Sequence, residues 1–318
     1  MSTRAKKPSR RPGNPARSRR PGAVAPARFG DWVAAARLRT LPLAIAPVFI
    51  GTGAASTVTG AHSVHWALGL ACLGVALALQ IGVNYANDYS DGIRGTDAYR
   101  VGPGRLTASG RARPRTVLAV ALAFFAVAAI AGVVVIVRTQ LWWLLAVGAA
   151  AIVAAWFYTG GKRPYGYHGL GEVFVFAFFG LAAVAGTEYV EVGSVTLEGW
   201  WGAVAAGFLA CAVLVVNNLR DIETDRAAGK RTLSVLIGST ASKALYTVLT
   251  LLPFAMLVLV ALFYTLGWLG LLVLFIALPA VIIAWTARTP RELVIALQLS
   301  GLVALLYGIA LWAAYTWS

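Results

Sequence analysis

The chain has 318 residues and a formal net charge of +15 at pH 7, yet only 12% of its residues are charged and 59% are hydrophobic. An average soluble domain carries about 25% charged residues, so this composition excludes a water-soluble globular protein. Cys72 and Cys211 both fall inside apolar runs. We interpret them as small buried hydrophobes, which argues against a disulfide or a metal pair.

Residues 1–28 form a segment of different character. They include nine Lys and Arg and no acid, together with many Pro, Ser and Gly. Such a segment cannot bury a core, so we expect a disordered basic tail that lies in the cytoplasm and contacts anionic lipid heads. It lacks the apolar stretch of a signal peptide, and no nucleic-acid partner is expected. Residues 29–318 are predicted to form one folded domain.

The domain is predicted to be an all-α membrane protein, a bundle of nine transmembrane helices. Phe29 to Arg39 predicts a short amphipathic helix at the membrane surface. Continuous apolar runs of about 20 residues follow, long enough to cross about 30 Å of hydrocarbon, whereas strands of a membrane β-barrel would alternate apolar and polar residues. The predicted spans are Leu41–Val58, Trp66–Ala86, Thr116–Val137, Leu141–Tyr158, Leu170–Thr187, Gly199–Leu219, Ala244–Tyr264, Gly267–Trp285 and Leu293–Tyr315.

Loop charges predict the orientation of this bundle. The N-terminal region and the loops after spans two, four, six and eight contain 26 of the 27 Lys and Arg residues. The other side has Arg138 together with Glu188, Glu191 and Glu198. Because basic residues are retained on the cytoplasmic side, we expect a cytoplasmic N-terminus and an external C-terminus in a multi-pass protein of the cell membrane.

Two acidic segments stand out from the apolar background. NYANDYSDGIRGTD, from Asn84 to Asp97, follows the second span, and NNLRDIETDRAAGKR, from Asn217 to Arg231, follows the sixth. In each, an Asn and two acids recur at helical spacing, which places them on one helix face. The two sets are Asn84, Asp88 and Asp91, and Asn217, Asp221 and Asp225. Since four spans separate them, both should lie at the cytoplasmic surface and form one site.

The side chains of these segments indicate diphosphate chemistry. Carboxylates that lie close together repel unless cations separate them, and oxygen ligands without Cys or His suit Mg²⁺ or Ca²⁺. Mg²⁺ typically uses one or two carboxylates and completes its shell with water and phosphate oxygens. Nearby bases would stabilise the phosphate charge. The candidates are Arg94, Arg105, Lys162, Arg163, Lys230 and Arg231.

At these residues the chain resembles the UbiA superfamily of intramembrane prenyltransferases, and the likeness extends over nearly all of residues 30–318. The segments RLRTLPLAIAPVFIG, NYANDYSDGIRGTD, VGPGRLTASG, YTGGKRPYGYHGLGE and NNLRDIETDRAAGKRTL carry it. In detail they are most similar to the branch of the family that prenylates 1,4-dihydroxy-2-naphthoate for menaquinone synthesis. The resemblance implies a nine-helix enzyme that takes a polyprenyl diphosphate and Mg²⁺ and faces the cytoplasm.

Site roles follow from the same resemblance. It implies that Mg²⁺ is held by Asp88, Asp91, Asp221 and Asp225, with Asn84 and Asn217 beside the metal-bound diphosphate. Lys162 and Arg163 match the basic pair of the loop that begins at Tyr158. Many superfamily members have an acid four residues after the second Asp, but here that position is Gly95 and Asp97 comes two residues later. Asp91 or Asp97 is the candidate base for the acceptor hydroxyl.

The implied reaction is transfer of the prenyl chain to the ring carbon that bears the naphthoate carboxylate, with loss of CO₂, to give a demethylmenaquinol. Another UbiA-type transferase, using 4-hydroxybenzoate or a similar acceptor, is the nearest alternative. A secondary transporter is a second alternative, but transporters place their polar groups near the membrane midplane. Here the polar residues gather at one surface.

Overall fold

The computed structural model describes residues 24–60, 65–96 and 105–318, and every regular element in these ranges is helical. The predicted basic tail, up to residue 23, and Asp97 lie outside the described residues. The elements are α1 (Phe29–Ala35), η1 (Leu38–Thr40), α2 (Pro42–Thr59), α3 (Trp66–Arg94), α4 (Pro114–Thr139), α5 (Leu144–Phe157), η3 (Tyr165–His168), α6 (Gly171–Val175), η4 (Phe176–Ala182), α7 (Ala183–Val192), α8 (Leu197–Arg220), α9 (Ile222–Ala227), α10 (Leu233–Ala261), η5 (Thr265–Val273), α11 (Leu274–Thr286) and α12 (Pro290–Trp317).

The all-helical membrane architecture is confirmed. In the described ranges, eight helical segments are long and apolar enough to cross a membrane, where α6, η4 and α7 together make one span and η5 and α11 another. The predicted span Leu141–Tyr158 corresponds to the 14-residue helix α5. At about 1.5 Å per residue, α5 is roughly 21 Å long, which is shorter than the hydrocarbon layer.

Local sequence explains where several helices begin and end. Pro42, Pro114 and Pro290 each occupy the first turn of a helix, where the missing proline N–H has no helical partner to lose. Gly95 follows the last residue of α3 with φ +73°. This left-handed conformation suits glycine, so α3 stops one turn after the first acidic motif.

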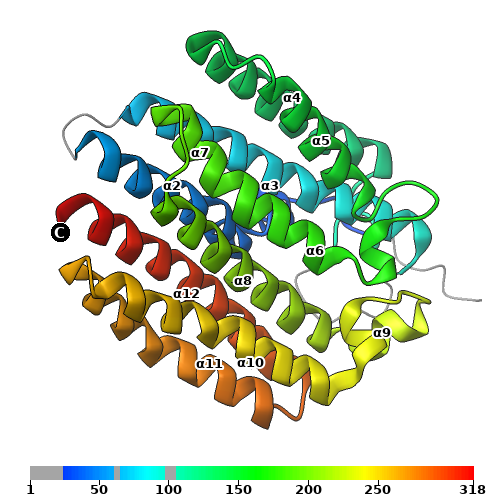
Figure 1. Cartoon of the computed structure of the whole chain (residues 1–318). Helices are drawn as coiled ribbons and strands as arrows, with labels where there is room; N and C mark the ends of the chain where they lie inside the picture. Colours follow the sequence, from blue (N-terminus) through cyan, green and yellow to red (C-terminus); the bar gives the residue numbers. More distant parts are fainter. Residues whose placement is uncertain (1–23, 61–64, 97–104) are drawn as a thin grey trace, which may run out of the picture.

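Helix α8 lies at the centre of the bundle. It packs against α2, α10 and α12, and its small residues allow close approach: a Cβ on Gly180 of η4 would lie only 2.6 Å from the Gly207 Cα. Small residues at helix contacts are the usual way to pack helices in membranes. Figure 1 shows α4 and α5 at one edge of the bundle, α10 and α11 at the opposite edge, and the C-terminus at the end remote from α9.

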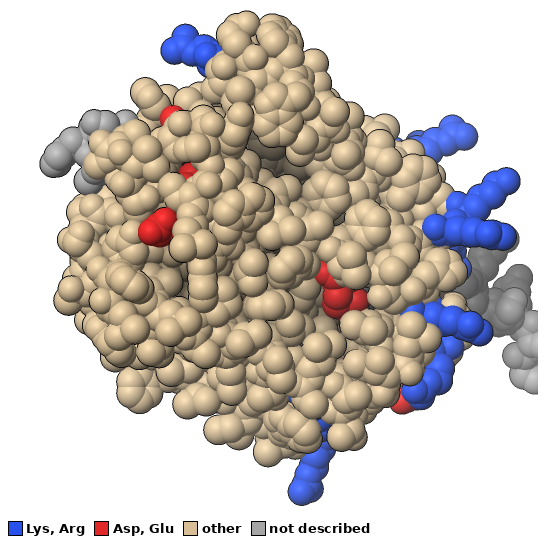
Figure 2. Space-filling view, viewed as in Figure 1, with Lys and Arg blue, Asp and Glu red and all other residues tan. Residues whose placement is uncertain are grey.

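Charged side chains are distributed unequally between the two ends of the bundle. On the face shown in Figure 2, most Lys and Arg side chains gather at the end where α9 lies, and acidic side chains are visible at the opposite end. The two acidic motifs end α3 and α8 on the basic side. The structure therefore places both motifs at one end of the bundle.

Candidate functional site

The two motifs are held by different backbone arrangements. Asn84, Asp88 and Asp91 all belong to the continuous helix α3, as the spacing predicts. In the second motif α8 ends at Arg220, and Asp221 has φ −98° and ψ 7° before the short helix α9 begins. Asp225 therefore sits on a separate helix, turned away from the axis of α8.

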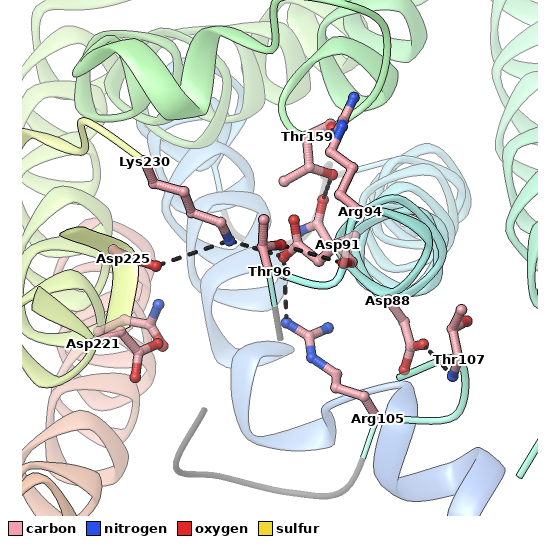
Figure 3. Close-up of polar contacts among 12 residues, drawn as sticks. Asp88, Asp91, Arg94, Thr96, Arg105, Thr107, Thr159, Asp221, Asp225 and Lys230 are labelled. Carbon is pink, nitrogen blue, oxygen red and sulfur yellow. Dashed lines mark hydrogen bonds and ion pairs between the residues drawn. The ribbon is translucent and has the colours of Figure 1, made fainter. Parts of the chain in front are cut away.

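An ammonium group joins the two motifs. The Lys230 Nζ lies 3.3 Å from Asp91 Oδ2 and 3.8 Å from Asp225 Oδ1 (Figure 3). The guanidinium of Arg105 lies 3.8 Å from Asp91 Oδ2. The side chains of Asp91 and Lys230 are buried. Acids from two distant segments thus face a common cation, which is the requirement for one shared site.

Asp88 makes a different set of contacts from Asp91. Its Oδ2 accepts a hydrogen bond from the Leu106 backbone N–H at 2.9 Å, and its Oδ1 accepts one from Thr107 at 2.9 Å. Figure 3 shows the carboxylate pointing toward Thr107. Asp88 therefore holds the backbone next to Arg105 in place, and so fixes the point from which the Arg105 side chain extends.

Asp221 is paired with the residue that precedes it. Arg220 donates from Nε to Asp221 Oδ1 at 2.7 Å and from a terminal nitrogen to Oδ2 at 2.6 Å, and it also reaches Asn217 Oδ1 at 3.0 Å. A two-pronged contact of this kind fixes both groups. Arg220 is buried, and sequence reasoning missed it because a basic residue near a membrane end is usually explained by topology.

The predicted diphosphate-binding loop is attached to α3 but presents its basic pair to the surface. Arg94 donates to the Thr159 and Gly161 carbonyls, and Thr159 Oγ1 donates to Asn87 Oδ1 at 2.7 Å. Lys162 and Arg163 follow in this loop and are exposed. The structure thus brings Asp91, Asp225, Lys230 and Arg105 together, whereas Lys162 and Arg163 lie on the neighbouring loop.

Tyr167 is a further residue that sequence reasoning missed. Its hydroxyl donates to Asp91 Oδ1 at 2.5 Å, and its ring centroid lies 4.7 Å from Lys230 Nζ and 5.5 Å from Arg94 Cζ. Burial, and then the neighbouring Asp91 carboxylate, raise the pKa of Tyr167 above its ordinary value. The hydroxyl therefore stays protonated and acts as a donor.

A cavity of about 590 Å³ leads from this region into the bundle. Its wall includes Cys72 and Asp88, which are sixteen residues apart on α3 and so about 24 Å apart along the helix axis. Apolar side chains of α3, α4, α5, η4 and α7 line much of the wall. The surface is hollowed beside the α4–α5 hairpin in Figure 2. The shape and lining fit a long hydrocarbon chain.

The end of the cavity near the motifs is polar and aromatic. Its charged lining residues are Arg37, Arg39, Asp88, Arg105 and Arg220. Tyr158 and Tyr165 lie there too, with ring centroids 5.6 Å apart. An amphiphile with an anionic head and an apolar tail matches this distribution.

The donor set fits Mg²⁺. Asp91 and Asp225 offer carboxylate oxygens toward one shared cationic position, and Mg²⁺ binds one or two carboxylates and keeps waters or phosphate oxygens as its other ligands. Across the described ranges, no group of three His, Cys, Asp or Glu side chains gathers closely enough to hold a metal by itself. A substrate phosphate is therefore a natural part of the coordination shell.

Fold and site together define a class of protein: an all-helical membrane protein with two acidic motifs and the polar end of a largely apolar cavity at one end of the bundle. Within that class, the chain belongs to the UbiA prenyltransferase family, whose model matches residues 44–298.

Individual proteins of this family are similar to the chain over most of its length. It is 49% identical over 286 residues to 1,4-dihydroxy-2-naphthoate octaprenyltransferase of Mycobacterium tuberculosis, covering 89% of this chain and 96% of that protein. The protein of the same name from Mycobacterium leprae is 46% identical, with 91% and 97% covered. A UbiA homologue from Archaeoglobus fulgidus, solved bound to GPP and Mg²⁺, superimposes with a TM-score of 0.62 at 16% identity, covering 89% of this chain and 99% of that one.

Proposed function

We propose that the protein transfers a polyprenyl chain from polyprenyl diphosphate to 1,4-dihydroxy-2-naphthoate, with loss of CO₂, to give demethylmenaquinol and diphosphate. The observation that carries the proposal is the meeting of Asp91 and Asp225 at Lys230, beside a long apolar cavity. The names of the mycobacterial relatives support the naphthoate acceptor over 4-hydroxybenzoate. Membership of a prenyltransferase family favours catalysis over transport.

Mg²⁺ is the proposed cofactor. Asp91 and Asp225 would hold it, with Asp88 and Asp221 as the remaining candidate ligands and Asn84 and Asn217 beside them. Bound Mg²⁺ supplies Lewis-acid stabilisation of the charge that develops on a leaving diphosphate. The Archaeoglobus homologue, which is solved with Mg²⁺ and GPP, supports this assignment at the level of the fold.

The protein's own residues would then guide the reaction. Lys230 and Arg105 stabilise the departing diphosphate, and Lys162, Arg163 and Arg94 contribute positive charge from the adjoining loop. The allylic C–O bond breaks and its electron pair leaves with the diphosphate. The ring carbon that bears the naphthoate carboxylate bonds to the allylic carbon, and loss of CO₂ restores the aromatic ring.

Aromatic side chains would protect the electrophilic carbon. Tyr158 and Tyr165 line the cavity near its polar end, and Tyr165 stacks on Phe174 with ring centroids 4.0 Å apart. Such walls keep water away from a reactive cation. Asp91 or Asp97 is the proposed base for the acceptor hydroxyl.

The proposed topology is a nine-span protein of the cell membrane, with α5 as the fourth span, the N-terminus in the cytoplasm and the C-terminus outside. The charge asymmetry between the two ends of the bundle supports this orientation. The active site then faces the cytoplasm, where a soluble aromatic acceptor and a polyprenyl diphosphate can both reach it.

The proposal is tested with purified protein, polyprenyl diphosphate, Mg²⁺ and each acceptor in turn, with products identified by mass spectrometry. We expect prenylated, decarboxylated product from the naphthoate alone. Asp91→Asn and Asp225→Asn should each lower kcat at least 100-fold. Glu223→Gln is the matched control, because Glu223 belongs to the same motif but is exposed and pairs with Arg226. Near-normal turnover in both Asn variants, or product from 4-hydroxybenzoate only, would refute the proposal.

A further inference from the structure

The fifth predicted span is interrupted by a π-helix. Helix η4, Phe176–Ala182, joins α6 to α7 within one continuous segment that is long enough to cross the membrane. In a π-helix each backbone N–H bonds to the carbonyl five residues earlier, so one turn contains about one residue more than a turn of α-helix. Such turns are rare and are found frequently at functional sites. Seven residues of π-helix in the middle of a span therefore point to a constraint that the surrounding structure imposes.

The π-helix keeps one face of this span on the cavity wall. Residues that line the cavity recur every four positions along the span: Phe174, Phe178, Ala182, Gly186 and Val190. A second series with the same spacing runs beside it from Val175 to Thr187. An α-helix turns about 100° per residue, so four residues overshoot one turn by about 40°, and the fifth member of a series would lie about 160° from the first. The wider turns of η4 oppose this drift, so residues at both ends of the span face the same cavity.

Buried acids tie the two ends of this span to other helices. Near the acidic motifs, Glu172 Oε1 accepts a hydrogen bond from Asn218 Nδ2 of α8 at 3.1 Å. At the opposite end, Glu191 Oε1 accepts one from Thr52 Oγ1 of α2 at 2.6 Å. Both acids are buried, and acids inside membrane spans are costly and usually functional. The span is therefore fastened on both sides of η4.

A third acid strengthens the tie at the end of α7. Glu188 is buried, and its Oε1 accepts hydrogen bonds from the backbone N–H and the hydroxyl of Thr196, at 2.9 and 2.6 Å. Thr196 is the residue before α8, so α7 is held against α8 as well as α2. Between the ties, Gly180 lets η4 approach α8, because a Cβ there would lie only 2.6 Å from the Ala203 carbonyl oxygen. With both ends held, a surplus residue between them is accommodated by a wide turn.

We propose that Glu188 and Glu191 are positioning residues that hold this span in its π-helical register, and that the register determines whether the cavity accepts a long prenyl chain. The inference rests on the proposed function, which places the prenyl chain in this cavity. Without the ties, η4 would relax to an α-helix and each residue after it would advance by one position along the helix. Tyr189 would then take the place of Val190 on the cavity wall. Its ring would fill the end of the cavity remote from the motifs, which a short chain does not reach.

Direct binding tests the inference without turnover. The probes are thiolodiphosphate analogues of the donor with two and with eight isoprene units, each titrated calorimetrically into purified protein in the presence of Mg²⁺. Combining Glu188→Leu with Glu191→Leu removes both hydrogen-bond acceptors and leaves apolar side chains in an apolar interior. We expect this leucine pair to weaken binding of the long analogue at least tenfold and of the short one less than twofold. Glu198→Leu is the control, because Glu198 lies at the same end of the bundle but accepts from Tyr264, and it should change neither.

Two further variants separate the register from other effects of these acids. Combining Glu188→Gln with Glu191→Gln keeps carbonyl oxygens that can accept the same hydrogen bonds, so this glutamine pair should restore binding of the long analogue. Deletion of Ala177, a residue of η4 that does not line the cavity, removes the surplus residue. In that background the span is an α-helix with or without the ties, so the leucine pair should change binding of the long analogue less than twofold.

If the deletion prevents folding, Tyr189→Ala replaces it as the second test, and in the leucine-pair background it should recover most of the binding of the long analogue. No recovery there overturns the inference. So does equal weakening by the leucine pair with and without Ala177, which would mean that the acids act on the cavity directly. Wild-type binding in the leucine pair, or equal effects of the leucine and glutamine pairs, also overturns it. A wild type that binds neither analogue refutes the proposed function instead, which is a distinct result.

Discussion

The Lys230 ammonium lies 3.3 Å from the Asp91 carboxylate, although Asp91 belongs to the first acidic segment and Lys230 to the second. The same ammonium lies 3.8 Å from Asp225. All three side chains are largely buried. Two buried carboxylates are therefore held close together by a positive charge supplied by the protein.

Removal of that charge should destabilise the protein. Lys230→Gln removes the cation that Asp91 and Asp225 share, and loss of one member of a buried ion pair costs roughly 3–5 kcal/mol. We expect a lower Tm in metal-free buffer and partial recovery in millimolar Mg²⁺, because a divalent cation can again separate the acids. Thermal unfolding in detergent measures both. Lys243→Gln is the control, since Lys243 contacts the Trp285 carbonyl away from the site. Equal Tm values for the two variants would contradict the expectation.

Tyr167 should matter through its hydroxyl. Tyr167→Phe keeps the ring beside Lys230 and Arg94 but removes the hydrogen bond to Asp91, and a hydrogen bond to a charged group contributes about 1.5–3 kcal/mol. We expect kcat to fall at least tenfold and Mn²⁺ affinity, measured by electron paramagnetic resonance, to fall with it. Tyr246→Phe removes a buried hydroxyl that bonds Ser300 in the core. If both variants lowered Tm equally and neither changed Mn²⁺ affinity, Tyr167 would have only a structural role.

The spacing of residues along the sequence predicts much of this structure, because residues three or four apart share one face of a helix. The apolar runs predict the helices, and the repeated Asn-to-Asp spacing predicts that Asp91 and Asp225 meet at one surface, as they do around Lys230. Spacing also groups Asn84 and Asp88 with them, but the structure uses Asn84 to hold the Ala36 carbonyl and Asp88 to hold Leu106. A side chain's partner across the fold is not encoded in its own helix.

Residues that act through distant partners were beyond the reach of sequence reasoning. Tyr167 joins Asp91 across 76 positions, and Asn84 donates to the Ala36 carbonyl across 48 positions. Hydropathy likewise marks Leu141–Tyr158 as a full span, whereas α5 begins only at Leu144, after a turn at Trp142 and Trp143. Apolar composition does not report where helical hydrogen bonding starts.

The orientation of the bundle can be tested with single cysteines. Gln140 follows α4, and Ser109 and Ser194 lie in connections on opposite sides of the proposed topology; all three are exposed. A membrane-impermeant maleimide applied to intact spheroplasts should label Gln140→Cys and Ser194→Cys, and should label Ser109→Cys only after permeabilisation.

Wild-type protein is the labelling control, because Cys211 is buried and Cys72 lies within α3. If α5 did not cross the membrane, Gln140→Cys and Ser194→Cys would label from different sides. If Ser109→Cys labelled in intact spheroplasts, the proposed cytoplasmic site would be wrong.

The apolar cavity should determine which donor chains are accepted. Gly132 of α4 lines the cavity, and a Cβ built on it meets no atom within 4 Å. A side chain at this position therefore begins in open space on the cavity wall, and Gly132→Phe also replaces a poor helix former with a better one. We expect an at least tenfold higher KM for a donor of eight isoprene units and little change for a donor of two.

Gly74 of α3 provides the matched control for this variant. A Cβ there also meets no atom within 4 Å, but Gly74 does not line the cavity. Gly74→Phe should therefore leave both KM values unchanged, because position 74 is not part of the cavity wall. If Gly132→Phe affected short and long donors equally, the hydrocarbon tail would have to follow another path, and the cavity along α3 would not be the prenyl site.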